Sequence, residues 1–182
     1  MTTPGMPSIR AIPLALLGCA LLGCGSAPDP LDPTDAAGGG GGGGASDGGT
    51  SDLDTTAAGL TAFVKEGRYK DWRAEPALHA STGPHGGKVR TFFNATLVSS
   101  LEANKDPHPV GSVMVKELWG SGTAITGHAV GVKVTEGAAA DTWLWYEGFV
   151  SSDYKNPFYG KGLSLCAGCH EQGADYVISA LP

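Results

Sequence analysis

The feature that most restricts how this chain can fold is an unbroken run of seven glycines, Gly38 to Gly44. It lies within residues 25–56, a stretch made mostly of Gly, Ala, Ser, Asp, Pro and Thr. Such a composition cannot bury enough apolar surface to offset the entropy lost on ordering. We therefore expect residues 25–56 to form a disordered tether with an average span of roughly 30 Å. Residues 57–182 are then left as one domain of ordinary size.

Residues 1–24 have the pattern of an export signal. Arg10 is followed by an apolar run over residues 11–17, which is too short to span a bilayer as a helix. Two lipobox-like tetrads end at Cys19 and Cys24, and either cysteine could carry a lipid after cleavage. We favour Cys24, because it ends the apolar run and a polar stretch follows. An ordinary signal peptide with incidental cysteines is the alternative. We thus expect a protein anchored by lipid on the periplasmic side of a bacterial membrane, the outer one rather than the inner.

The charge is distributed unevenly along the chain. The formal net charge is −6, and six aspartates but only Arg10 precede Thr55. From Thr55 onward, eleven Lys and Arg residues nearly balance twelve Asp and Glu residues. The acidity therefore belongs to the tether. Since the domain has no basic excess, we expect no nucleic-acid partner and no membrane contact beyond the lipid.

The motif that carries chemistry is Cys166-Ala167-Gly168-Cys169-His170, close to the end of the sequence. A C-x-x-C-H run is typical of c-type haem attachment: the two thiols bind the haem vinyl groups and the imidazole binds the iron. A thioredoxin-like redox pair would need a strand-to-helix context inside a βαβ unit, which is absent. A zinc site would need a second cysteine pair outside the signal. The motif predicts one covalent haem c per chain, held by Cys166, Cys169 and His170.

The periodicity of the domain predicts an α+β fold. We expect a predominantly antiparallel β-sheet with a short C-terminal haem-attachment helix. A threonine cap precedes the first expected helix, and Val-rich and aromatic runs bounded by Gly, Pro and Asp mark the strands. The expected helices cover residues 57–65 and 96–103, the turn covers 69–72, and the strands cover 88–94, 112–119, 124–134 and 142–147.

Other potential haem-contacting residues are less specific. Met114 is the only methionine outside the signal and lies in a Val-rich strand, so we expect a core residue rather than an iron ligand. His128 lies inside a strand and could face the pocket, but we expect it to be half-buried with its hydrogen bonds satisfied. The remaining residues of interest are the loop histidines His79, His85 and His108, expected at the surface or organising loops, and the aromatics Phe92, Phe93, Trp143, Trp145 and Tyr146, expected in the core and around the haem.

Several short segments occur in a characteristic order ahead of the cysteine motif. They are residues 69–72, 83–86 with 89–90, 109–117 and 143–146, followed by 166–170 and 175–177. In this order they resemble the cytochrome P460 family, which includes the β-sheet cytochromes c′, over essentially the whole domain. The resemblance implies a mainly β fold, often a homodimer, with five-coordinate haem c. It also implies a pocket for small nitrogen species, for hydroxylamine oxidation or nitric oxide binding.

The resemblance also implies further site residues. Cytochromes P460 proper carry a lysine cross-linked to the haem; Lys105 is nearest by position, and Lys116 and Lys133 lie on strands and could also point inward. They also carry a pocket carboxylate, for which the corresponding strand, residues 129–133, offers no acid. Glu117 is the nearest alternative, although it could equally face solvent. This departure favours gas binding or a cryptic redox role over hydroxylamine oxidation.

Three functions follow from these observations. The first is an oxidoreductase acting on hydroxylamine or nitric oxide. The second is a non-catalytic haem protein that binds nitric oxide. The third is a tethered electron-transfer cytochrome with a redox partner protein.

Overall fold

The structure is a computed structural model and describes residues 52–181, which belong to the unit formed by residues 43–182. The predicted signal segment 1–24, with Cys19 and Cys24, and the tether up to residue 51 lie outside the described residues. Within residues 52–181, none of the helices has the length and hydropathy needed to span a membrane.

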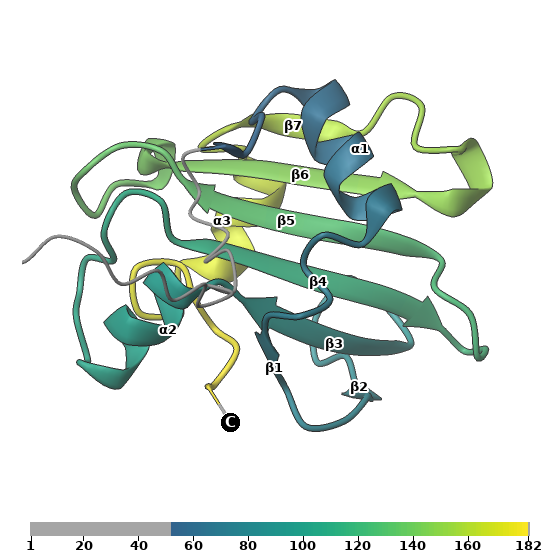
Figure 1. The fold of residues 1–182 in the computed structure, drawn as a ribbon, viewed down its shortest axis with the longest axis horizontal. Coiled ribbons are helices and arrows are strands. Elements are labelled where there is room, and N and C mark those ends of the chain that lie inside the picture. Colours follow the sequence, from purple (N-terminus) through teal and green to yellow (C-terminus); the bar gives the residue numbers. More distant parts are fainter. Residues whose placement is uncertain (1–51, 182) are drawn as a thin grey trace, which may run out of the picture. The chain divides into compact units, whose positions relative to one another are not determined.

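The centre of the fold is a seven-stranded antiparallel sheet (Figure 1). Its order is β1-β3-β4-β5-β6-β7, and β2 pairs with the other end of β3 from β1. The strands are β1 (Arg73–Ala74), β2 (His79–Ala80), β3 (Lys88–Phe93), β4 (Val113–Gly120), β5 (Gly127–Lys133), β6 (Trp143–Phe149) and β7 (Phe158–Lys161). The helices are α1 (Ala57–Glu66), α2 (Ala95–Glu102) and α3 (Ser164–His170), with short 3-10 helices at Ala140–Thr142 and Val150–Ser152.

Helix α1 covers one side of the sheet. The Thr56 side chain accepts a hydrogen bond from the Gly59 amide at 3.1 Å and caps the first turn. Gly67 ends the helix in the left-handed conformation, φ 70°, that glycine adopts without a steric penalty. The apolar side of α1 then packs on alternate residues of the central strands. This core contains Leu60, Phe63, Val64, Tyr69, Phe92, Val113, Val115, Val130, Val132, Leu144, Tyr146 and Tyr154.

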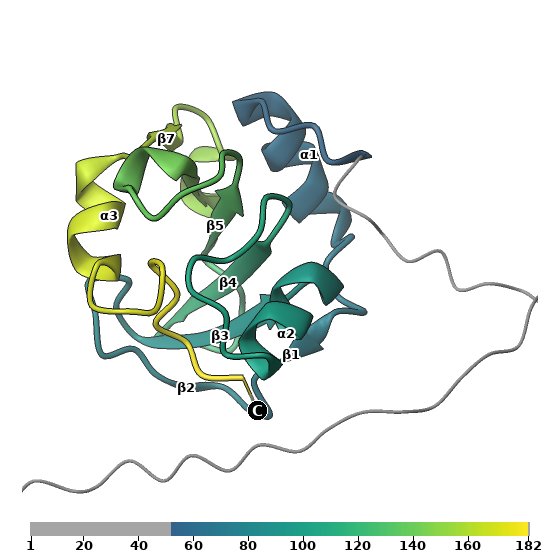
Figure 2. The ribbon, with the colours of Figure 1, turned by 90° about the vertical axis from the view of Figure 1, so that its left-hand side faces the viewer.

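Helix α3 lies on the opposite side of the sheet from α1 (Figure 2). Because successive strand residues point to opposite faces, the residues between those of the α1 core face α3. A second apolar cluster fills part of this side, where Leu97 of α2 and Val177 of the C-terminal segment meet the sheet. Its buried members are Phe93, Leu97, Met114, Trp143, Trp145 and Val177.

The prediction of an antiparallel α+β fold with a short C-terminal helix is confirmed. The four predicted strands correspond to β3, β4, β5 and β6, and both predicted helices form within one residue of their expected bounds. Strands β1, β2 and β7 were not predicted, because two to four residues are too few to show a period. The threonine cap of α1 was predicted and is present.

Candidate functional site

A cavity of about 240 Å³ lies between α3 and the α3-facing side of the sheet. Both cysteines of the motif and its histidine contribute to its wall. The main lining side chains are Pro84, His85, Thr91, Met114, Lys116, Ala129, Trp145, Glu147, Phe158, Leu165, Cys166, Cys169 and His170. The sheet thus places residues from β3 to β7 opposite the helix that carries the motif.

The floor of the cavity exists because β5 presents small residues there. Ala129 lies between Lys116 on β4 and Glu147 on β6 in the strand register, and Gly131 is the next residue of β5 on this side. A Cβ atom at Gly131 would lie 2.7 Å from Cε of Met114, so a larger residue would force the neighbours apart. The glycine of β5 therefore accommodates the side chains of Met114 and Trp145, which line the cavity.

Both thiols of the motif are free, and they lie one turn apart on α3. Burial raises the pKa of the Cys166 thiol to about 11, and the nearby Glu147 and Cys169 add to the effect. The Cys166 sulfur is therefore a neutral thiol at neutral pH. Since two thiols on one helix face the same cavity, they can bind two points along one edge of a ligand.

His170 is held in the state that a metal ligand requires. Its Nδ1–H donates to the Tyr176 carbonyl at 2.8 Å, which leaves the lone pair on Nε2. The ring is buried and packs against Trp145 with centroids 4.6 Å apart. Burial lowers the pKa of His170 to about 4, although the bond to Tyr176 opposes the shift. The imidazole is therefore neutral at physiological pH and oriented before any metal binds.

His85, Lys116 and Glu147 share the cavity with the motif. His85 comes from the loop before β3 and donates through Nδ1 to Oε1 of Glu147 at 3.1 Å. Lys116 lies two strands from Glu147, across Ala129. Burial lowers the pKa of the Lys116 amine, while the charges of Glu75 and Glu147 oppose the shift. The cavity therefore holds a base, an imidazole and an amine within an otherwise apolar wall.

The three lysines proposed for a haem cross-link lie in different places relative to the cavity. Lys105 is exposed in the segment after α2 and does not line the cavity. Lys133 is buried and forms an ion pair with Asp175, 2.6 Å away. Lys116 alone of the three lines the cavity.

Glu117 lies on the α1 side of the sheet and does not line the cavity. It accepts hydrogen bonds from Tyr69 at 2.9 Å and from Trp119 at 3.0 Å, and it pairs closely with Lys70. Burial alone would raise the pKa of Glu117, but the bonds and charge of its partners hold it below its ordinary value. The carboxylate near the cysteine motif is Glu147, which sequence reasoning missed.

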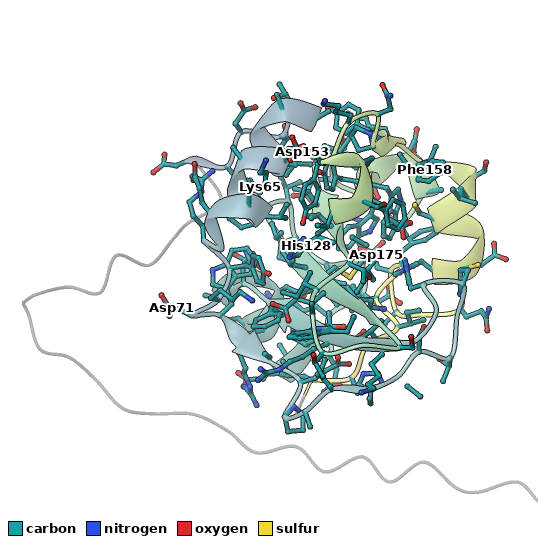
Figure 3. The ribbon with its side chains drawn as sticks, turned by 90° about the vertical axis from the view of Figure 1, so that its right-hand side faces the viewer. Lys65, Asp71, His128, Asp153, Phe158 and Asp175 are labelled. Atoms are coloured by element: carbon teal, nitrogen blue, oxygen red, sulfur yellow. The ribbon has the colours of Figure 1, made fainter. Side chains whose placement is uncertain are left out.

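The other histidines occupy different environments. His85 bonds Glu147 and so holds its loop against the sheet, as a loop-organising residue does, and it also lines the cavity. His128 is satisfied as expected: its two ring nitrogens bond the hydroxyls of Tyr69 and Tyr154, both at 2.8 Å, on the α1 side. His108 is buried and bonds Ser100, and His79 bonds Glu75. Figure 3 shows His128 toward the α1 side and Phe158 beside α3.

The expected core residues are in place, with one addition. Met114 is buried in the α3-side cluster, as predicted for a core methionine, and it also contributes to the cavity wall. The five predicted aromatics are all buried, and Phe92 and Tyr146 belong to the α1-side core. Phe158 of β7 lines the cavity and was not predicted, because β7 gave no sequence signal.

The residues present fit a haem group. The indole Nε1–H of Trp145 is buried without a hydrogen-bond partner in the described part of the chain. Leu165 and Phe158, both in the cavity wall, are 54% and 48% exposed, so a bound apolar group could cover them.

Comparison with known protein-family models and with curated proteins found no match to this chain.

Proposed function

We propose that this protein is an exported c-type haem protein of cytochrome P460 type that binds or oxidises small nitrogen species such as hydroxylamine or nitric oxide. The observation that carries the proposal is the cavity itself. Cys166, Cys169 and His170 open into one space, and the imidazole is neutral, buried and oriented through Nδ1. Tyr176 and Trp145 fix the ring from two directions.

Bound haem would supply an iron that binds a small ligand and exchanges electrons with it. The chain's own residues supply the rest. Cys166 and Cys169 would form the covalent links, and His170 would bind the iron through Nε2. Met114, Trp145 and Phe158 would place apolar side chains around the group. Small uncharged ligands would therefore be preferred over bulky or charged ones.

Glu147 and His85 favour hydroxylamine oxidation among the candidate reactions. Proton-coupled oxidation of a bound amine needs a base near the reacting atom. The Glu147 carboxylate can accept a proton, and the Nδ1–H of His85 donates to that carboxylate and holds it in place. Lys116 replaces Lys105 as our candidate for a haem cross-link, because its amine lies in the cavity and its pKa is lowered by burial.

The apolar part of the wall favours a second function, non-catalytic nitric oxide binding. Nitric oxide is a neutral diatomic and needs no proton transfer to bind. In that case His85 and Glu147 would serve only to hold the loop before β3 against the sheet. Loss of Glu147 would then leave ligand binding intact, whereas it would abolish proton-coupled turnover.

The setting that we propose follows from the segments outside the described residues. A lipid on Cys24 would anchor the chain on the periplasmic side of a membrane, and residues 25–51 would let the haem domain reach a redox partner protein. A homodimer remains part of the proposal through the family resemblance. None of these features needs a nucleic acid.

The decisive experiment produces the full chain with c-type haem maturation and records oxidised and reduced optical spectra with the intact mass. We expect the mass of one haem, lost in the Cys166→Ser, Cys169→Ser double variant. A strongly red-shifted reduced Soret band that disappears in Lys116→Met but persists in Lys105→Met would identify the cross-linking lysine. A wild-type chain with no covalent haem would overturn the proposal.

Turnover then separates the two candidate functions. With hydroxylamine as substrate, we expect Glu147→Gln to lower the rate by about 10²-fold or more, the range for loss of a general base. Glu117→Gln, a buried glutamate on the α1 side, is the matched control and should keep its rate. Nitric oxide binding without any hydroxylamine turnover would favour the non-catalytic function.

A further inference from the structure

We propose that the buried ion pair between Lys133 and Asp175 positions the imidazole of His170. The pair holds a strained turn, and the carbonyl of that turn orients the ring. The inference rests on the proposed function in one respect, that His170 binds the haem iron. Lys133 and Asp175 do not line the cavity, so their role is positioning and not catalysis.

The ion pair is completely buried and fully bonded. Nζ of Lys133 lies 2.6 Å from Oδ2 of Asp175, and both side chains are 0% exposed. The same ammonium donates to the Gly137 carbonyl and, at 2.8 Å, to Oγ1 of Thr142. All three of its hydrogens therefore have partners, which a buried charge requires. Lys133 ends β5, so this arrangement attaches the sheet to the segment after α3.

The carboxylate of Asp175 is fixed from two further directions. Its Oδ2 also accepts the backbone N–H of His108 at 2.8 Å. Its Oδ1 accepts the indole N–H of Trp143 at 3.3 Å. Three partners from separate parts of the chain therefore determine where residue 175 lies.

Residues 175 and 176 form a turn that needs such support. Asp175 has φ 40° and Tyr176 has φ 69°, in the left-handed region that residues other than glycine rarely adopt. The turn is closed by the bond from the Val177 amide to the Ala174 carbonyl at 2.9 Å. Disfavoured backbone of this kind persists only where the surrounding contacts fix it. The bonds to the Asp175 carboxylate are those contacts.

The turn presents the Tyr176 carbonyl to His170. That carbonyl accepts the Nδ1–H of the imidazole at 2.8 Å, one residue from the ion pair. Such a bond sets both the ring orientation and the donor strength of the other ring nitrogen in metal-binding histidines. A turn that loosens would lengthen the bond and weaken Nε2 as a ligand.

The Asp175 carboxylate also supports the His170 ring through two tryptophans. Trp143, which donates to Asp175, stacks on Trp145 with centroids 5.9 Å apart. Trp145 in turn packs on His170 at 4.6 Å. The ion pair therefore supports both groups that contact the imidazole, its hydrogen-bond acceptor and its packing partner.

The test measures the iron–imidazole stretching band of the haem-loaded, ferrous full chain by resonance Raman spectroscopy, together with the reduction potential. The variants are Lys133→Met, Asp175→Asn and the two combined. Removing the lysine charge should lower the potential, and removing the aspartate charge should raise it. Loss of positioning should instead shift the stretching band to lower frequency in all three variants. The stretching band therefore distinguishes the loss of imidazole orientation from the loss of a charge.

The control is Glu117→Gln, which removes a buried charge from the α1 side of the same sheet. It should lower stability without moving the band. Where Lys133 or Asp175 variants do not fold, Trp143→Phe removes a single donor to Asp175 and should give a smaller downward shift. If the haem-loaded Lys133 and Asp175 variants keep the iron–imidazole stretching frequency of the wild type, the inference is wrong and the proposed function still stands. A wild-type chain that takes up no haem would overturn the proposed function and the inference with it.

Discussion

The two sides of the sheet differ in how their buried polar groups are paired around the space next to the sheet. On the α1 side, the Tyr69 hydroxyl bonds Glu117 and His128, and His128 bonds Tyr154. On the α3 side, a buried Trp145 N–H has no partner in the described residues, and thiols and an imidazole line an open space. The α1 side is thus complete by itself. On the α3 side, the unpaired N–H and the open space fit the haem that we propose, since buried polar atoms are usually paired.

The largest difference between the two sides should appear in stability. Leu60 in α1 is 0% exposed, so Leu60→Ala should lower the free energy of unfolding by about 3 to 4 kcal/mol. Leu165 in α3 is 54% exposed, and Leu165→Ala should cost no more than about 0.5 kcal/mol in the haem-free chain. Urea denaturation of both variants checks this. Similar losses would contradict the view that α1 covers the finished core.

The α1 side should also give the protein a pH dependence. Burial lowers the pKa of His128 to about 4 from an ordinary 6.5, with Glu117 opposing and Lys70 assisting the shift. The unfolded chain therefore binds more protons than the folded one between these values, so stability falls as the pH falls from 6.5 toward 4. A shift of this size corresponds to roughly 3 kcal/mol.

The variant His128→Gln isolates that contribution. Its free energy of unfolding should change less than that of the wild type between pH 7 and pH 4.5, measured by urea denaturation at each pH. The contribution of His170 is the same in both chains and cancels in the comparison. If the free energy of unfolding changes equally with pH in the wild type and in His128→Gln, then His128 is not the group responsible.

Removing a single hydroxyl should have different effects at paired and unpaired positions. Tyr69→Phe leaves Glu117 and His128 each short of a buried partner and should cost about 2 kcal/mol. The Ser112 hydroxyl is buried and has no partner in residues 52–181, so Ser112→Ala should change stability by less than about 0.5 kcal/mol. Thermal unfolding distinguishes the two. A destabilised Ser112→Ala would mean that its hydroxyl is satisfied after all.

The smallest effect is expected at the exposed edge of the α1 side. Lys65 and Asp153 form an ion pair at 2.9 Å, with side chains 47% and 70% exposed. Solvent screens such pairs, so Asp153→Asn should leave the midpoint of urea denaturation nearly unchanged. Asparagine also tolerates the left-handed backbone of this position, φ 51°. If Asp153→Asn lowered stability more than Tyr69→Phe does, the predicted order of the stability effects would be wrong.

Much of the fold could be predicted because its signals are local. Thr56 and Gly67 mark the ends of α1 through hydrogen bonds that span a few residues. The mainly apolar sequences of β4 and β6 reflect burial of both faces of these strands in the middle of the sheet. Strand β7 could not be predicted, because its four residues become a strand only by pairing with β6.

The site was harder to predict than the fold. Glu147 could have been found from its spacing, since it lies two residues from Trp145 on the same strand and therefore on the same side. His85 could not, because a loop carries it to the cavity. That loop is placed by the contact of Gly87 with Gly120, 33 positions further along the chain.

The sequence by itself determined what local spacing can determine: the helix caps, the strand period and the adjacency of Cys166, Cys169 and His170. It also determined that Lys116 and Glu117 point to opposite sides, since successive residues of a strand do so. Only the tertiary structure decided which side is which. That choice depends on where α1 and α3 dock, and docking is set by contacts between residues far apart in the chain.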